Sequence, residues 1–209
     1  MQKILTNYEF EVAKKLLHLA LDNAAAAFSK MAMDQVLVKN FDIYILEKDS
    51  FAKTINPQSE RSYFILTTEM KGDLSAKSYL IFDQLDISKI NKLFLNQDTH
   101  SINGELTPLQ QSILLELDNI ISASMITQIA NLLNVFVYGD VPYLDYLSKN
   151  DMLKIFHQDS LVHNPALSMQ AKFQLSNTQI ASSFLWFFTT DFLFSIKKLV
   201  NQKQHVSFI

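Results

Sequence analysis

Two long amphipathic runs, at residues 8–33 and 109–133, dominate the pattern of hydrophobic and polar positions. In each run apolar residues recur at the three- and four-residue spacing of one helical face. Each run also follows a threonine whose third successor is Glu or Gln, which is typical of a capping box. The two boxes are Thr6 with Glu9 and Thr107 with Gln110. The pattern therefore predicts two long helices that begin 101 positions apart.

The same offset of 101 continues beyond the helices, because the Leu-Ser pair at 74–75 recurs at 175–176. After each helix the pattern predicts a short strand, an irregular connection, an apolar hairpin and a closing helix. The predicted strands are 36–38, 62–70, 74–82, 136–138, 169–175 and 180–189, and the closing helices are 87–95 and 191–201. We therefore expect a single α+β domain over 1–209 made of two repeats, about 1–101 and 102–209. Their strands are expected to form one mixed or antiparallel sheet, covered by long helices and pseudo-two-fold symmetric.

Composition excludes several classes of function. With 48% hydrophobic and 19% charged residues, the chain of 209 residues can bury a substantial core. A net charge of -3 without a basic cluster argues against nucleic-acid binding, and zero cysteines exclude disulfides and cysteine nucleophiles. Residues 1–7 lack the apolar core of a signal peptide, and the most apolar stretch, 180–196, is too short to cross a bilayer. A cytoplasmic protein with no membrane partner is expected.

A polar stripe interrupts the second amphipathic run. Ser112, Glu116 and Asn119 stand at i, i+4 and i+7, which places their side chains on one helical face. Neighbouring Ile and Leu residues already supply an apolar face, so the stripe is predicted to be exposed. Pro142 follows Asn119 after twenty-two intervening residues. The pattern resembles that of the CheC, CheX and FliY family of chemotaxis response-regulator phosphatases, in which Asp or Ser, Glu, Asn and Pro have this spacing.

The resemblance implies an enzyme that hydrolyses the aspartyl phosphate of a CheY-like receiver domain in chemotaxis or two-component signalling, without a covalent enzyme intermediate. Asn119 would orient the attacking water, and Glu116 would pair with the active-site lysine of the receiver. No cofactor is expected in this chain, because the receiver binds its own divalent metal. The alternative is a non-catalytic CheC-like adaptor or flagellar-switch protein that binds a receiver domain or CheD. A monomer is favoured over a homodimer, because both halves are in one chain.

Four further residues complete the candidate site: Ser112, Ser122, Ala123 and Pro142. The small side chains at 122 and 123 would let the backbone of a partner approach closely, or would serve tight packing between helices. Ser112 would line the site or bond back to its own helix, and Pro142 would have a geometric role. Asp118 and Ala123 stand where the family usually has glycine, and about 200° of helical rotation should direct Asp118 away from the stripe.

The first half is expected to lack this site. The offset of 101 aligns Glu11 with Ser112, Lys15 with Glu116, His18 with Asn119 and Phe41 with Pro142. None of the functional residue types is retained, so the sequence predicts a degenerate site in the first repeat and an intact site in the second. We also expect His18 to have a structural role, because an isolated histidine on an amphipathic helix is more often structural than catalytic.

Overall fold

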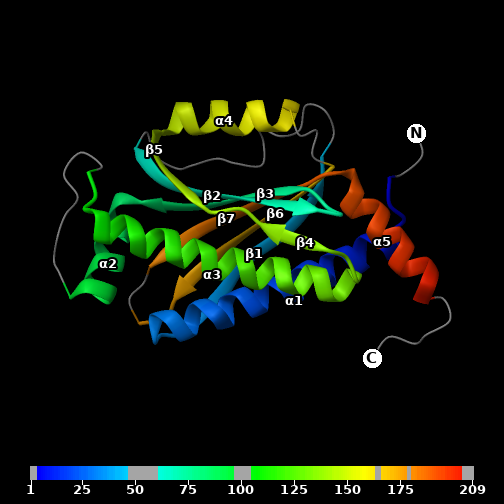
Figure 1. Ribbon diagram of the computed structural model, residues 1–209, viewed down its shortest axis with the longest axis horizontal. Helices are drawn as coiled ribbons and strands as arrows, with labels where there is room; N and C mark the ends of the chain where they lie inside the picture. The colour runs from blue at the N-terminus through cyan, green and yellow to red at the C-terminus, as the bar shows by residue number, and fades with distance from the viewer. Residues whose placement is uncertain (1–3, 47–60, 97–104, 163–165, 178–179, 204–209) are drawn as a thin grey trace.

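The computed structural model describes residues 4–46, 61–96, 105–162, 166–177 and 180–203. In chain order, their helices and strands are α1 (Asn7–Ala32), β1 (Val36–Ile45), β2 (Ser62–Gly72), β3 (Ala76–Asp83), α2 (Gln84–Leu95), α3 (Pro108–Leu133), β4 (Val137–Gly139), β5 (Tyr143–Ser148), α4 (Lys149–Val162), β6 (Leu167–Leu175), β7 (Ala181–Phe188) and α5 (Thr190–Lys203) (Figure 1). The predicted boundary between the repeats, near residues 101 and 102, lies outside the described residues.

Both long helices begin where their capping boxes predict. The Thr6 hydroxyl accepts the backbone amide of Glu9 at 3.2 Å, and the Glu9 carboxylate accepts the amide of Thr6 at 2.6 Å. The box of α3 has the same two bonds, at 3.3 and 2.8 Å. Both helices have 26 residues and end at a residue with left-handed backbone, Met33 or Asn134. The two predicted helices and their offset are confirmed, whereas duplication of an ancestral unit stays a prediction.

The strands in the described part of the chain form one seven-stranded antiparallel sheet in which the two halves interleave. Its order is β1-β6-β7-β3-β2-β4, and β5 also pairs with β2. The two predicted hairpins, β2–β3 and β6–β7, meet at the centre, where β3 pairs with β7 and Leu80 lies opposite Phe184. β1, β2 and β3 of the first half correspond to β4, β6 and β7 of the second. When each strand is exchanged for its counterpart, the sheet has the same order counted from its opposite edge. The α+β fold class is confirmed. The sequence predicted either a mixed or an antiparallel sheet, and the sheet is antiparallel.

The main core lies between one face of the sheet and the long helices. α1 and α3 lie side by side across this face, with α2 and α5 at the ends (Figure 1). Alternate residues of the central strands point into it, including Phe173, Phe184 and Trp186, all 0% exposed. Phe28 of α1 meets Phe173 edge to face at a centroid distance of 6.2 Å. Burial of this apolar face holds the two halves together as one domain.

α4 covers the other face of the sheet (Figure 1). It buries Met152 and Phe156 against a smaller cluster that includes Ile65, Tyr79 and Phe187. The sequence pattern did not predict α4, and it did not predict β5 either, because among the described strands β5 pairs with β2 alone, far away in the chain. Two apolar positions four apart are a weak helical signal, and the sheet surface that stabilises them forms only in the fold.

Candidate functional site

A line of exposed side chains runs along the outer face of α3. It contains Ser112, Glu116, Asn119 and Ala123. Their spacing of four, three and four positions places them above one another on the helix. The opposite face is buried, with Leu114, Leu117, Ile121 and Met125 all 0% exposed. The predicted exposure of the polar stripe is therefore confirmed, while the roles of its residues stay predictions.

The two functional groups of the stripe are available to a partner. Among the described residues, neither the Glu116 carboxylate nor the Asn119 carboxamide has a hydrogen-bond or ion-pair partner. A carboxylate accepts hydrogen bonds from a cation such as lysine, whereas a carboxamide both donates and accepts. The pair can therefore hold a cationic group and orient a water molecule one helical turn apart.

Pro142 lies at the junction of β4 and β5, which both pair with β2. It is buried, and a position between two strands suits a residue that cannot donate to a strand ladder. The chain reaches this junction through Gly139, where an added Cβ would lie only 2.9 Å from the Cδ1 atom of Ile126 in α3. This close approach brings the segment before Pro142 against the site helix, which fits the geometric role expected for the proline.

Ser122 does not line the surface. It is 1% exposed, and its hydroxyl lies 3.4 Å from the hydroxyl of Ser78 in β3. The interpretation as an exposed partner-binding residue is therefore wrong for Ser122. Its side chain is closely packed, as the alternative predicted, but against strand β3 and not between helices. One step along a helix rotates a side chain by about 100°, so Ser122 points inward although its neighbour Ala123 is exposed.

Asp118 points into the core, as the helical rotation predicts. It is 0% exposed, and its Oδ2 atom accepts a hydrogen bond from the Thr68 hydroxyl at 2.6 Å. Burial raises the pKa of Asp118 to about 6, although hydrogen bonds from Thr68 and Ser122 act in the opposite direction. The helical pattern indicated the direction of this side chain but not its partner, because only the fold brings β2 beneath α3.

Solved structures of FliY, of chemotaxis proteins and of a FliG–FliM complex resemble this chain over most of its length. FliY from Thermotoga maritima has a TM-score of 0.70 at 16% identity, covering 97% of this chain and 100% of that chain. A chain of the CheX–CheY–BeF3–Mg2+ complex from Borrelia burgdorferi gives 0.56 at 11% identity, with 81% and 95% covered. A chain of the FliG–FliM complex from Helicobacter pylori gives 0.59 at 10% identity, with 90% and 99% covered. The chain has the CheC-like fold.

Neither a protein-family model nor a curated protein matches the sequence. At 16% identity or less, the likeness to these structures shows a shared fold and does not carry an activity with it. α3 is the one described helix that is long and apolar enough to cross a membrane, but 44% of that window is buried inside the fold. In the CheC-like fold the apolar residues of α3 serve the core.

The outer face of α1 lies at the positions equivalent to the stripe of α3. Glu11, Lys15, His18 and Asp22 are exposed there, each 101 positions before a stripe residue. The Nδ1 atom of His18 is 3.0 Å from Asp22, and its ring meets Phe41 edge-on at a centroid distance of 5.0 Å. The structure therefore presents the first-half face to solvent, but without a Glu and Asn pair.

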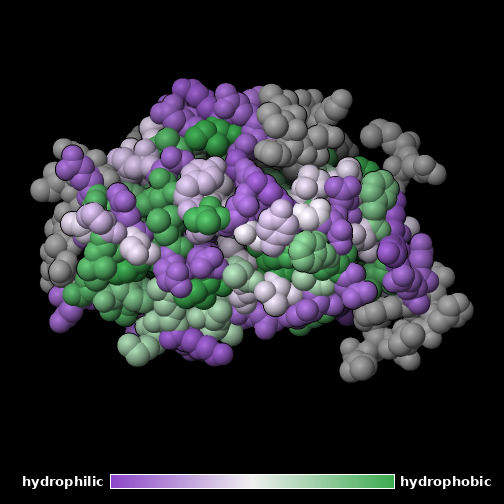
Figure 2. Space-filling view, viewed as in Figure 1, coloured by the Kyte–Doolittle hydropathy of each residue, from purple (hydrophilic) through white to green (hydrophobic). Residues whose placement is uncertain are grey.

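The surface around the two long helices is mixed in character. Figure 2 shows hydrophobic and hydrophilic residues interleaved over α1 and α3, with more hydrophobic surface toward the end where α2 lies. Leu85 of α2 and Leu109 of α3 are 56% and 57% exposed. The stripe is therefore part of a surface that offers both polar and apolar contacts.

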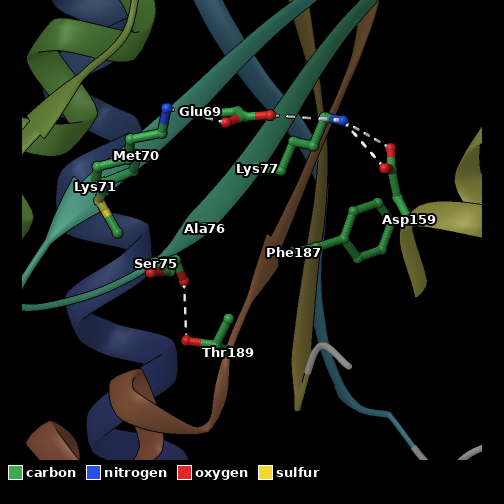
Figure 3. A pocket seen from close by; sticks show the side chains of 9 residues that line it. All are labelled: Glu69, Met70, Lys71, Ser75, Ala76, Lys77, Asp159, Phe187 and Thr189. Atoms are coloured by element: carbon green, nitrogen blue, oxygen red, sulfur yellow. Dashed lines mark hydrogen bonds and ion pairs between the residues drawn. The ribbon is translucent and has the colours of Figure 1, made fainter. Parts of the chain in front are cut away.

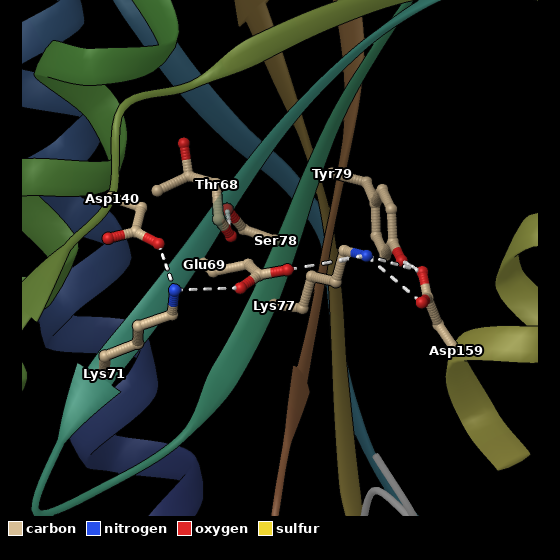
Figure 4. Close-up of polar contacts among 8 residues, drawn as sticks. All are labelled: Thr68, Glu69, Lys71, Lys77, Ser78, Tyr79, Asp140 and Asp159. Atoms are coloured by element: carbon tan, nitrogen blue, oxygen red, sulfur yellow. Dashed lines mark hydrogen bonds and ion pairs between the residues drawn. The ribbon is translucent and has the colours of Figure 1, made fainter. Parts of the chain in front are cut away.

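A row of charged side chains crosses the opposite face of the sheet. The sequence pattern did not predict it. Lys71 pairs with Asp140 and lies 3.4 Å from Glu69. Lys77 lies 3.9 Å from Glu69 and 3.0 Å from Asp159 of α4 (Figures 3 and 4). The polar residues at alternating positions 67, 69 and 71 were the available signal. Because both lysines are already paired with carboxylates, the cluster is better suited to hold strands and α4 together than to bind an anion.

Tyr79 contacts α4 at the end of this row of charged side chains. Its hydroxyl donates to Asp159, and its ring lies 4.5 Å from that of Phe156. Burial, together with the Asp159 carboxylate, raises the pKa of Tyr79 well above its usual range. A pocket beside these residues is also lined by Ser75 and Thr189, and the Thr189 hydroxyl donates to the carbonyl of Ser75 at 3.1 Å (Figure 3).

Proposed function

We propose that this chain belongs to the CheC, CheX and FliY family and accelerates hydrolysis of the aspartyl phosphate of a CheY-like receiver domain in the cytoplasm. The observation that carries the proposal is the exposed, unpartnered pair of Glu116 and Asn119 on one face of α3. The pair stands on a CheC-like fold, and one protein with this fold was solved as a CheX–CheY complex with BeF3 and Mg2+.

Each residue of the pair has one task in this reaction. Glu116 accepts a hydrogen bond from the active-site lysine of the receiver, which fixes the docking register. Asn119 holds a water molecule in line with the bond between phosphorus and the aspartyl oxygen. The water oxygen bonds to phosphorus as that bond breaks, which frees phosphate and restores the carboxylate of the receiver.

The catalytic demand on this chain is small. A hundredfold acceleration corresponds to about 2.7 kcal/mol, which positioning of a nucleophile can supply. The receiver brings its own divalent metal, so the proposal assigns no metal or cofactor to this chain. Ser112 and Ala123 extend the docking surface on either side of the pair, and Pro142 fixes the neighbouring connection.

A second candidate is a non-catalytic protein of the flagellar switch, or an adaptor for a receiver domain or CheD. It is supported by the likeness to a chain of the FliG–FliM complex over 90% of this chain. The α1 face, which lacks the Glu and Asn pair, is compatible with a binding role. The two candidates differ in whether a bound receiver loses its phosphoryl group faster.

The test is the decay of a phosphorylated CheY-like receiver from the same genome, with this protein at substoichiometric concentration. We expect faster decay with the wild type and no acceleration with the variant Glu116→Ala, Asn119→Ala. The matched control is Lys15→Ala, His18→Ala on the equivalent face of α1, which should keep full acceleration. Receiver binding with unchanged decay would favour the adaptor, and full activity of the Glu116 and Asn119 variant would refute the assigned site.

A further inference from the structure

The carboxyl group of Asp118 lies directly beneath the candidate site. In sequence it stands between Glu116 and Asn119, but its side chain points to the opposite side of the helix and is 0% exposed. Its Oδ2 atom accepts the hydrogen bond from Thr68 of β2 at 2.6 Å. The residue between the two proposed functional residues is therefore bonded to the sheet.

Hydroxyl groups surround this carboxyl. The Ser122 hydroxyl, one turn later on α3, is also close enough to this carboxyl to lower its pKa. The Ser78 hydroxyl lies 3.4 Å from that of Ser122 and donates to the Thr68 carbonyl at 3.2 Å. Figure 4 shows Thr68 and Ser78 next to each other on the neighbouring strands β2 and β3. The cluster connects α3 to two central strands.

Within the part of the chain that the structure describes, no positive charge compensates this carboxyl. The faces that α1 and α5 bury are apolar, β4 presents Gly139 toward α3, and the titratable group of β5 on this side is Tyr146, whose ring packs on Phe64. Burial is what raises the pKa of Asp118, and the groups that oppose it are the hydroxyls of Thr68 and Ser122. Among the described residues Asp118 forms no ion pair, and its Oδ1 atom has no hydrogen-bond partner.

Packing alone does not account for an acidic residue here. Apart from Gln110 and Ser122, the other buried side chains of α3 are apolar, including Leu114, Leu117 and Ile121. A buried carboxyl without a cationic partner destabilises a fold relative to an apolar residue of similar size. What an apolar residue could not provide is the directional bond to Thr68.

We propose that Asp118 is a positioning residue of the site and that its state of protonation makes the activity of the site depend on pH. This inference rests on the proposed function. The bond to Thr68 fixes the rotation of α3 over β2, and thereby the directions of Glu116 and Asn119. When Asp118 is neutral, α3 packs on an uncharged core. When it is ionised, a charge without a cationic partner lies beneath the helix and weakens the packing of α3 on the sheet. A displacement of about 1 Å is enough to impair catalysis that works by positioning.

The experiment compares the acceleration of receiver dephosphorylation, relative to spontaneous decay, from about pH 5.5 to about pH 8. For the wild type we expect a fall of about threefold or more with rising pH, with a midpoint near pH 6. Asp118→Asn keeps a hydrogen-bond acceptor for Thr68 but cannot ionise, so its acceleration should stay level. Thr68→Val removes the donor and should lower the acceleration at every pH. Asp34→Asn is the matched control, because Asp34 is a buried carboxyl bonded to Asn177, and it should keep the wild-type profile.

Parallel profiles of the wild type and Asp118→Asn would overturn the inference while leaving the proposed function intact. Absence of acceleration by the wild type at every pH would instead overturn the proposed function, and this inference with it. Carbon-13 NMR of the wild-type protein gives a readout that needs neither a receiver nor a variant. The Asp118 carboxyl should titrate near pH 6, and titration near pH 4 would overturn the inference even if Asp118→Asn did not fold.

Discussion

Replacement of Asp118 by asparagine should stabilise the fold at neutral pH and remove part of its pH dependence. Asparagine has nearly the same shape and can accept the hydrogen bond from Thr68 through its amide oxygen. It carries no charge, so it avoids the penalty of an ionised group that is 0% exposed. The perturbation therefore isolates the ionisation of one buried carboxyl.

The magnitude follows from the pKa of Asp118, which burial raises from an ordinary 3.8 to about 6. The folded state then binds the proton more tightly than the unfolded state does. Its stabilising contribution is complete below about pH 4 and is lost as the pH rises through about 6. A pKa difference of about two corresponds to roughly 3 kcal/mol in total, of which about 1 kcal/mol falls between pH 5 and pH 7.

Urea unfolding of both proteins at several pH values measures this contribution, because the dependence due to all other groups cancels in the difference. The fluorescence of Trp186, the single tryptophan, reports on unfolding, since its side chain is 0% exposed in the folded state. The free energy of unfolding of Asp118→Asn minus that of the wild type should rise by about 1 kcal/mol from pH 5 to pH 7. A constant difference, or one that falls, would refute the reasoning.

Two further substitutions test contacts that hold the fold together outside the candidate site. Gly72→Ala should destabilise the fold by about 2 kcal/mol or more in urea unfolding, because the backbone at Gly72 has φ +119 and a Cβ would lie 2.3 Å from the Phe136 carbonyl oxygen; unchanged stability would contradict this. Asp159→Asn should weaken the attachment of α4 through Tyr79 and Lys77 and cost about 1–3 kcal/mol of stability. Receiver dephosphorylation should stay unchanged, since α4 covers the face of the sheet away from α3, and a loss of activity in the folded variant would contradict that separation.

The parts of the fold that local sequence predicts are those with local physical causes. The capping boxes at Thr6 and Thr107 act within three residues, so the starts of α1 and α3 are readable from the chain. The hairpins β2–β3 and β6–β7 join neighbouring apolar segments and were predicted with small errors at their ends. The helical period also placed Glu116 and Asn119 on one exposed face and turned Asp118 inward.

Other features depend on contacts between residues that are distant in sequence. α4 forms where Met152 and Phe156 find the apolar surface of the sheet, and β5 forms because β2 offers a free edge. The candidate role of Ser122 failed for a related reason. Whether a small residue on a helix faces a partner or the core depends on what packs beside it, and here Ser78 of β3 occupies that side.

The sequence by itself determined the two long helices, their common offset of 101 and the polar stripe on the second, because helical periodicity and capping act over a few residues. Only the tertiary structure decided how the halves share one sheet, that α4 covers its second face, and that Thr68 reaches the carboxyl beneath the stripe. These outcomes arise from burial of apolar faces and from hydrogen bonds across fifty or more positions, which no local pattern encodes.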